Sequence, residues 1–154
     1  MLSQRLVKHR YGVIAVALAV LLVAGCATSP TPLAQAVEVP PARRFPFPPA
    51  GAAAGTVTIV RDGGFTGSGC YLDLHVNRTR VARIAPGERI DVAVSAGEVL
   101  LRTGRDPDGS GLCAASSSGD WRQRETQIKP GERKVFRVMM GTSFEVDIVR
   151  AAAD

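Results

Sequence analysis

The sequence predicts an all-β fold, a small antiparallel β-sandwich or barrel of about seven to eight strands after a signal peptide and a disordered linker. Beyond residue 55, apolar residues alternate with polar ones in short runs. Turn sequences rich in glycine and proline separate these runs, and no stretch has helical spacing. These observations divide the chain into a signal segment, a linker, a β-domain and a tail: 1–25, 26–54, 55–150 and 151–154.

Residues 1–25 have the organisation of a secretory signal peptide. Three basic residues, Arg5, Lys8 and Arg10, precede an uninterrupted apolar run over 13–24. That run is well short of the roughly 20 apolar residues that a membrane-spanning helix requires. We therefore expect export of the chain and no permanent span.

The end of this segment carries a lipidation signal. Val23-Ala24-Gly25-Cys26 resembles the bacterial lipobox, in which small residues precede a cysteine that is lipidated on sulfur and becomes the mature N-terminus. The resemblance implies more than one acyl chain on Cys26, palmitate included, and stable anchoring in a lipid bilayer. Because Ala27 and not aspartate follows, it also implies the outer membrane, with the domain facing the periplasm. The alternative is an ordinary cysteine before a conventional cleavage site.

The linker, residues 26–54, is expected to be a lipidated cysteine followed by a tether rich in proline and alanine. Seven of the ten prolines lie between residues 27 and 54, where apolar periodicity is almost absent. Such a stretch should be extended or disordered and bury no core. As a polyproline-like chain it reaches up to roughly 80 Å. Its segment 43–49, with the sequence RRFPFPP, either docks in a partner's groove or is plain linker.

The β-domain is predicted from period-two apolar runs. A further strand is expected over 122–128. Tight turns separate the runs, for example at 62–64, 85–87 and 130–131. The alternating residues are Val57 and Ile59; Leu72, Leu74 and Val76; Val81 and Ile84; Ile90, Val92 and Val94; Val99 and Leu101; Phe136, Val138 and Met140; Phe144, Val146 and Ile148.

Cys70 and Cys113 are the two cysteines left after Cys26. Export places them in an oxidising compartment, so a disulfide between them is expected. Both follow a Gly-Ser-Gly sequence that lets the backbone adapt. A metal pair or a reactive thiol is the alternative, but no further ligand stands nearby at suitable spacing. The domain would therefore fold by its own core and one covalent link, independently of residues 1–54.

Candidate chemical residues are few. Strand alternation places Tyr71, Asp73 and His75 on the face opposite the apolar residues, where they form either an acid–base row or an ordinary solvated face. Trp121 either anchors a ligand or packs at the sandwich edge. The serines at 116–118 lack the context of a nucleophile. The turn at 106–110 has two aspartates but none of the later ligands of a calcium loop. We predict no catalytic residue, no metal and no cofactor.

Along residues 70–102 the order of strands and turns resembles the PEGA-like modules of bacterial envelope lipoproteins. The sequences Leu74-His75-Val76-Asn77-Arg78, Pro86-Gly87-Glu88 and Ala96-Gly97-Glu98-Val99 carry the resemblance, which covers about a third of the chain. It implies a non-enzymatic role.

Three functions remain open at the level of sequence. The first is a non-catalytic envelope lipoprotein that presents a disulfide-linked β-domain to another envelope protein or to peptidoglycan. The second is a lipoprotein inhibitor of a secreted hydrolase, which would insert the loop 116–119 into the enzyme. The third is a periplasmic hydrolase built on His75 and Asp73. Nucleic acid is not an expected partner, because the formal charge of +5 falls to +2 without the three basic residues of the signal segment.

Overall fold

The computed structural model describes residues 28–114 and 121–151. Cys26, the signal segment and the serines at 116–118 lie outside the described residues. None of the helices in the described ranges is long and apolar enough to cross a membrane. The described elements are the strands β1 (Val37–Glu38), β2 (Ala54–Arg61), β3 (Leu72–Val76), β4 (Thr79–Ile84), β5 (Glu88–Ser95), β6 (Gly97–Arg105), β7 (Arg122–Ile128), β8 (Arg133–Met140) and β9 (Val146–Ala151), and the short 3₁₀ helices η1 (Pro41–Arg43) and η2 (Gly111–Cys113).

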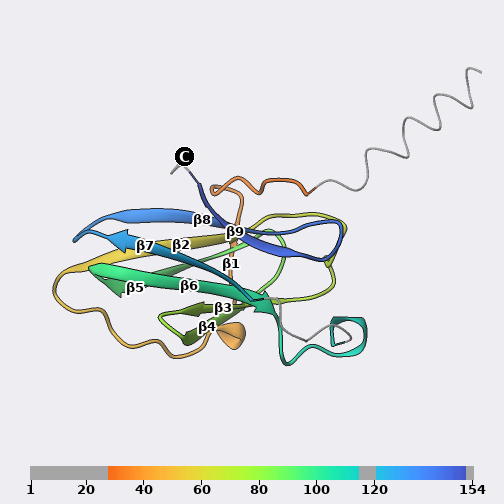
Figure 1. The fold of residues 1–154 in the computed structure, drawn as a ribbon, viewed down its shortest axis with the longest axis horizontal. Coiled ribbons are helices and arrows are strands. Elements are labelled where there is room, and N and C mark those ends of the chain that lie inside the picture. The colour runs from red at the N-terminus through yellow and green to blue at the C-terminus, as the bar shows by residue number, and fades with distance from the viewer. Residues whose placement is uncertain (1–27, 115–120, 152–154) are drawn as a thin grey trace, which may run out of the picture.

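The strands form two sheets that pack as a sandwich (Figure 1). One sheet has the order β1-β5-β2-β8-β9, and the other has the order β4-β3-β6-β7. The predicted all-β sandwich is confirmed. The sheet is not wholly antiparallel, however, since β2 pairs with β8 in parallel and β1 pairs with β5 in parallel. A parallel β2–β8 pair is possible because the whole four-stranded sheet lies between these strands in the chain.

The core follows the alternation expected from sequence. On β5, Ile90, Val92 and Val94 are buried while the residues between them are exposed. The run that ends in Ile148 is an exception, because Phe144 is not in a strand. Its φ of +65° places it in a turn, and its side chain is half exposed. Strand β9 begins two residues later, at Val146.

The segment before β2, which we call the strap (residues 28–53), closes one seam between the sheets. Its strand β1 pairs with β5 of the first sheet. After η1, the backbone N–H of Phe45 donates to the carbonyl of Val81 on β4 of the second sheet at 2.9 Å. Between these contacts Val39 is completely buried in the core. After them, Phe47 is partly buried and packs against the same core. The strap therefore bridges the edges of both sheets.

The prediction of a tether that buries no core is wrong for residues 28–54. Proline and the lack of periodicity favour an extended chain, and the strap is indeed mostly extended. Extended chain can nevertheless pair with a free sheet edge, and Val39 and Phe47 supply apolar contacts at the seam. Arg43 fixes the strap further through paired hydrogen bonds to Glu88 and one of 3.0 Å to the carbonyl of Arg83. The basic, aromatic segment 43–47 thus docks on its own domain.

Arginines close the opposite seam, where the edge strands β7 and β9 face each other. Arg122 Nε donates to the carbonyl of Val146 at 3.1 Å, and Arg124 Nε donates to the carbonyl of Ile148 at 2.7 Å. These side chains satisfy carbonyls that a free edge would expose to another strand. The edge strands of this seam are therefore not free to pair with another strand.

Candidate binding pocket

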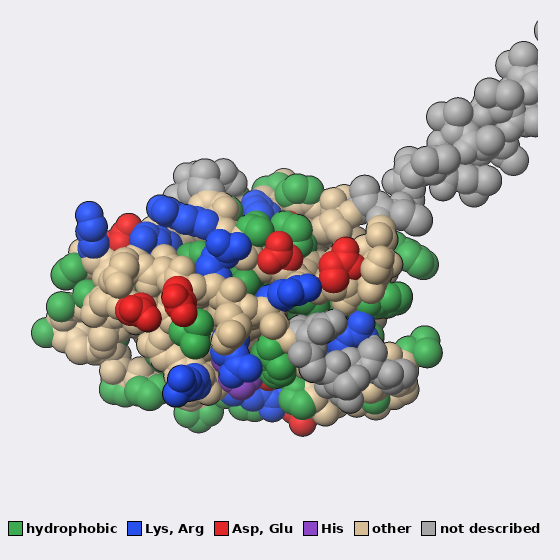
Figure 2. Space-filling model, viewed as in Figure 1, with side chains coloured by type: hydrophobic (Ala, Val, Ile, Leu, Met, Phe, Trp, Pro, Cys, Tyr) green, Lys and Arg blue, Asp and Glu red, His purple; other side chains and the backbone are tan. Residues whose placement is uncertain are grey.

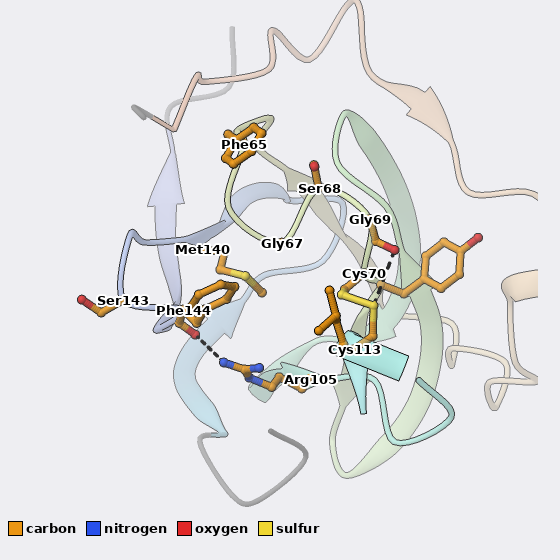
Figure 3. Close-up of a pocket in the computed structure, with 12 residues that line it drawn as sticks. Phe65, Gly67, Ser68, Gly69, Cys70, Arg105, Cys113, Met140, Ser143 and Phe144 are labelled. Carbon is orange, nitrogen blue, oxygen red and sulfur yellow. Dashed lines mark hydrogen bonds between the residues drawn. A yellow bond between two sulfur atoms is a disulfide. The ribbon is translucent and has the colours of Figure 1, made fainter. Parts of the chain in front are cut away.

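A pocket of about 650 Å³ lies at the end of the sandwich where the chain enters the domain. Three connections surround it: the loop 62–71 between β2 and β3, the segment 106–114 after β6, and the turn 141–145 between β8 and β9. Figure 3 shows Phe144 and Met140 on one side of the pocket and the Cys70–Cys113 disulfide on the other. Its volume falls within the range of small-molecule sites in proteins.

The disulfide forms one wall of this pocket. Cys70 and Cys113 are bonded, as the sequence predicted, with their Cα atoms 5.4 Å apart. The bond joins the loop 62–71 to η2, two segments with little regular hydrogen bonding of their own. It therefore holds two walls of the pocket together as well as stabilising the fold.

A buried arginine shapes the adjacent loop. Arg61, at the end of β2, is almost completely buried, and its guanidinium donates to the carbonyls of Gly67, Cys70 and Ile84 at 2.6 to 2.9 Å. Burial lowers the pKa of Arg61 to about 10. Two of these bonds are to carbonyls of the loop 62–71, and the third is to the end of β4, so Arg61 fixes the loop against the sheet beside the pocket.

Two backbone positions with positive φ place the pocket's apolar groups. Gly67 has a φ of +67°, a conformation that strains residues other than glycine, and a Cβ added there would lie 2.2 Å from the Met140 sulfur and displace that side chain. Phe144 adopts a φ of +65° although it is not glycine. Its N–H donates to the carbonyl of Gly141, which holds the turn and points the ring toward the pocket (Figure 3). Such strain, maintained at an exposed aromatic residue, marks a candidate functional position.

Arg105 is the charged group in the pocket lining. Its guanidinium lies 5.5 Å from the centre of the Phe144 ring and donates to the Phe144 carbonyl at 3.3 Å. The described lining residues include no carboxylate. The site therefore combines an apolar hollow with one positive charge at its wall.

Asp73 and His75 of the predicted row lie away from the pocket, on the outer face of the four-stranded sheet. Asp73 is buried and not solvated, which corrects the simple solvated-face interpretation. It accepts hydrogen bonds from Arg80 Nε at 2.6 Å and pairs with His75 Nε2 at 2.8 Å. Arg80 also forms an ion pair with Asp106. The charged side chains on this face therefore pair with one another. Tyr71 alone touches the pocket, which it lines from the side of β3.

The aspartates of the turn 106–110 belong to the same network. Asp106 is buried under Arg83, whose Nε donates to it at 2.7 Å, and Asp108 pairs with Arg80 at 2.8 Å. Arginines thus occupy the oxygens that a cation would need. In the described parts of the chain, no group of three or more His, Cys, Asp or Glu side chains is placed to hold a metal ion.

Trp121 packs on this network and not in the pocket. Its ring meets the His75 ring edge to face, with centroids 4.9 Å apart, and covers Gly104 on β6. An added Cβ at Gly104 would lie 2.8 Å from the indole, so glycine is required there. Trp121 thus packs over the two central strands on the outer face of the sheet, and not at the sandwich edge.

The His75→Ala variant should be less stable by roughly 1–2 kcal/mol, since it removes the contact with Trp121 and one hydrogen bond to Asp73. Asp73 keeps Arg80 as a partner, which limits the loss. Urea denaturation of His75→Ala, Trp121→Leu and the double variant would measure this. Strictly additive losses would contradict direct support of His75 by Trp121.

Sequence reasoning missed most of the pocket. It singled out Tyr71 and the two cysteines, but not Phe65, Leu112 or Arg105, which lie in or beside turns that carry no periodic pattern. One feature of the sequence could have indicated the pocket. Bulky apolar residues stand alone in glycine-rich loops, where polar residues are usual.

Comparison with known proteins gives no relative for this chain, since no protein-family model, curated protein or solved structure matches it. The site is therefore interpreted from its own geometry.

Proposed function

We propose that this protein is a lipid-anchored protein of the bacterial cell envelope that acts by binding, through the pocket end of its β-domain, and not by catalysis. The observation that carries the proposal is the pocket itself: an apolar hollow with exposed apolar side chains around it, one positive charge, and a disulfide as its wall. Large exposed apolar side chains gathered at one place are typical of interaction sites.

The sequence and the disulfide support the cellular location. The basic residues and apolar run of the signal segment and the lipobox-like Val23-Ala24-Gly25-Cys26 favour export and acylation. Disulfides persist in oxidising compartments such as the periplasm, and the Cys70–Cys113 bond fits that location. The outer membrane is the expected site, and an envelope protein or peptidoglycan remains a candidate partner in addition to the bilayer.

The alternative of a hydrolase has weaker support. His75 pairs with Asp73, but its other described contacts are the carbonyl of Arg78 and the ring of Trp121, and none of these is a nucleophile. The loop 116–119, on which an inhibitory role would depend, lies outside the described residues. Binding by the pocket is therefore the function that the described geometry favours.

Acylation of Cys26 is tested by metabolic labelling with a lipid precursor. Wild-type protein should incorporate the label and fractionate with membranes, whereas Cys26→Ala should do neither, because the thiol is the attachment point. Cys70→Ala with Cys113→Ala is the matched control and should still be labelled. Labelling of Cys26→Ala, or recovery of wild type in the soluble fraction, would refute the anchor.

A further inference from the structure

The first described residue, Thr28, is held at the pocket end of the domain. Its Oγ1 donates to the carbonyl of Met140 at 3.1 Å, and its Cα would lie 3.4 Å from a Cβ added to Gly64. Ser29 continues the attachment through two backbone hydrogen bonds of 3.0 Å with Gly63. Met140 also lines the pocket. The strap therefore begins beside the pocket.

This attachment sets the distance between the domain and a lipid anchor. One residue, Ala27, separates Cys26 from Thr28. Two residue steps of fully extended chain span about 7 Å. If Cys26 is acylated, the distance from the bilayer to the pocket end of the domain is therefore limited to about 7 Å of backbone and the length of the cysteine side chain. A free tether would allow roughly 80 Å.

The exposed apolar side chains gather at this same end. Five large hydrophobic side chains are exposed among the described residues, and four of them line the pocket. Leu112 is 91% exposed, Phe65 is 79% exposed and Phe144 is 50% exposed. Figure 2 shows hydrophobic side chains projecting from the right-hand end of the molecule. Exposure of these apolar side chains to water is unfavourable, and their insertion among lipid chains would remove that apolar surface from water.

The charge in the pocket lining complements phospholipid. Arg105 takes part in none of the ion pairs between described residues. One of its N–H groups donates to the Phe144 carbonyl, which leaves others for an acceptor such as a phosphate oxygen. Tyr71, with an apolar ring and a polar hydroxyl, is a residue type favoured at the membrane interface.

We propose that the pocket end of the domain docks on a phospholipid surface, with Phe65, Leu112 and Phe144 inserted among the lipids and Arg105 facing their phosphate groups. This inference rests on the proposed lipid anchor and names the partner of the same pocket. The domain then lies directly on the membrane, and the pocket opens toward the acyl chains.

The test uses protein that starts at residue 26 and carries Cys26→Ser, so that no acyl chain contributes to binding. Circular dichroism and peptide mapping of the disulfide establish that it is folded. We expect it to sediment with vesicles of phosphatidylethanolamine and phosphatidylglycerol, more strongly as the share of phosphatidylglycerol rises and less strongly in high salt.

Three substitutions at the pocket should weaken this partitioning by roughly tenfold or more: Phe65→Ser, Leu112→Ser and Phe144→Asn combined. Asparagine is chosen at position 144 because it tolerates the positive φ there. Val37→Ser is the matched control, since Val37 is 66% exposed but lies on β1, away from the pocket lining. It should bind as the parent does.

Arg105 variants and a depth probe separate lipid from other partners. Arg105→Gln should lose the preference for phosphatidylglycerol, and Arg105→Lys should retain it. Tryptophan fluorescence of Leu112→Trp should be quenched by brominated lipids, whereas that of Val37→Trp should stay at the level of the parent with its native Trp121.

Folded parent protein that stays in the supernatant would overturn the docking proposal, as would equal binding by the triple variant. A dimer in solution that the triple variant disrupts, without vesicle binding, would assign this face to a second copy of the chain. Vesicle binding combined with unlabelled Cys26 in cells would instead refute the anchor and leave the docking surface in place.

Discussion

The Val39→Asp variant is expected to be unfolded or nearly so, although residue 39 lies in a segment rich in proline. Val39 is completely buried between the two sheets. An aspartate there would place an unpaired carboxylate in the core, at a cost of several kcal/mol. A domain of this size has a total stability of about 5–15 kcal/mol, so most of the folded population would be lost. Thermal denaturation followed by circular dichroism measures the effect.

Val37→Asp is the matched control for this experiment. It makes the same change two residues earlier, on a side chain that is largely exposed, and should shift the melting temperature little. Truncation gives a second readout: protein that starts at residue 48 lacks β1 and Val39 and should be strongly destabilised. Equal melting of Val39→Asp and Val37→Asp would show that the strap is not part of the core.

Removing the disulfide is expected to lower the free energy of unfolding by about 4 kcal/mol at most, because the bond closes a loop with a sequence separation of 43 in the unfolded chain. Urea denaturation of wild type and of Cys70→Ala with Cys113→Ala would measure the loss. Because the bond also joins two pocket walls, vesicle binding by the double variant should fall even in buffers where it remains folded.

A reductant provides the control for this prediction. Dithiothreitol should bring the wild-type midpoint close to that of the double variant and leave the double variant itself unchanged. A loss of less than about 1 kcal/mol would indicate that the loops are held by other contacts, chiefly the three hydrogen bonds of Arg61, and that the disulfide adds little.

The strand pattern could be predicted from sequence because burial of one sheet face imposes a period of two. Ile90, Val92 and Val94 alternate with exposed residues, and the structure buries all three. Phe144 continues the same alternation in the sequence. In the structure its N–H donates to the carbonyl of Gly141 in the turn before β9, so residue 144 is not part of the strand. Alternation indicates which side chains share one face of a sheet, but it does not indicate at which residue the strand begins.

The strap could not be predicted, because its fold depends on partners distant in the chain. The short alternation Val37-Glu38-Val39 does not show which valine is buried. The seam that Val39 fills exists only once β4 and β5 lie at the edges of different sheets. Arg61 is a similar case. A charged residue at a strand end normally faces water, and only the folded loop and the end of β4 together supply the three carbonyls that make the burial of Arg61 tolerable.

The sequence by itself determined the all-β class and the inward-facing residues, since alternation and turn formers are local features of the chain. It also predicted the paired cysteines, from the expectation of export. The tertiary structure alone decided that residues 28–54 belong to the fold, that Asp73 is buried under Arg80, and that Phe65, Leu112 and Phe144 meet at one end. These features depend on loops brought together by packing and by one disulfide, and no periodic pattern encodes the positions that loops reach in space.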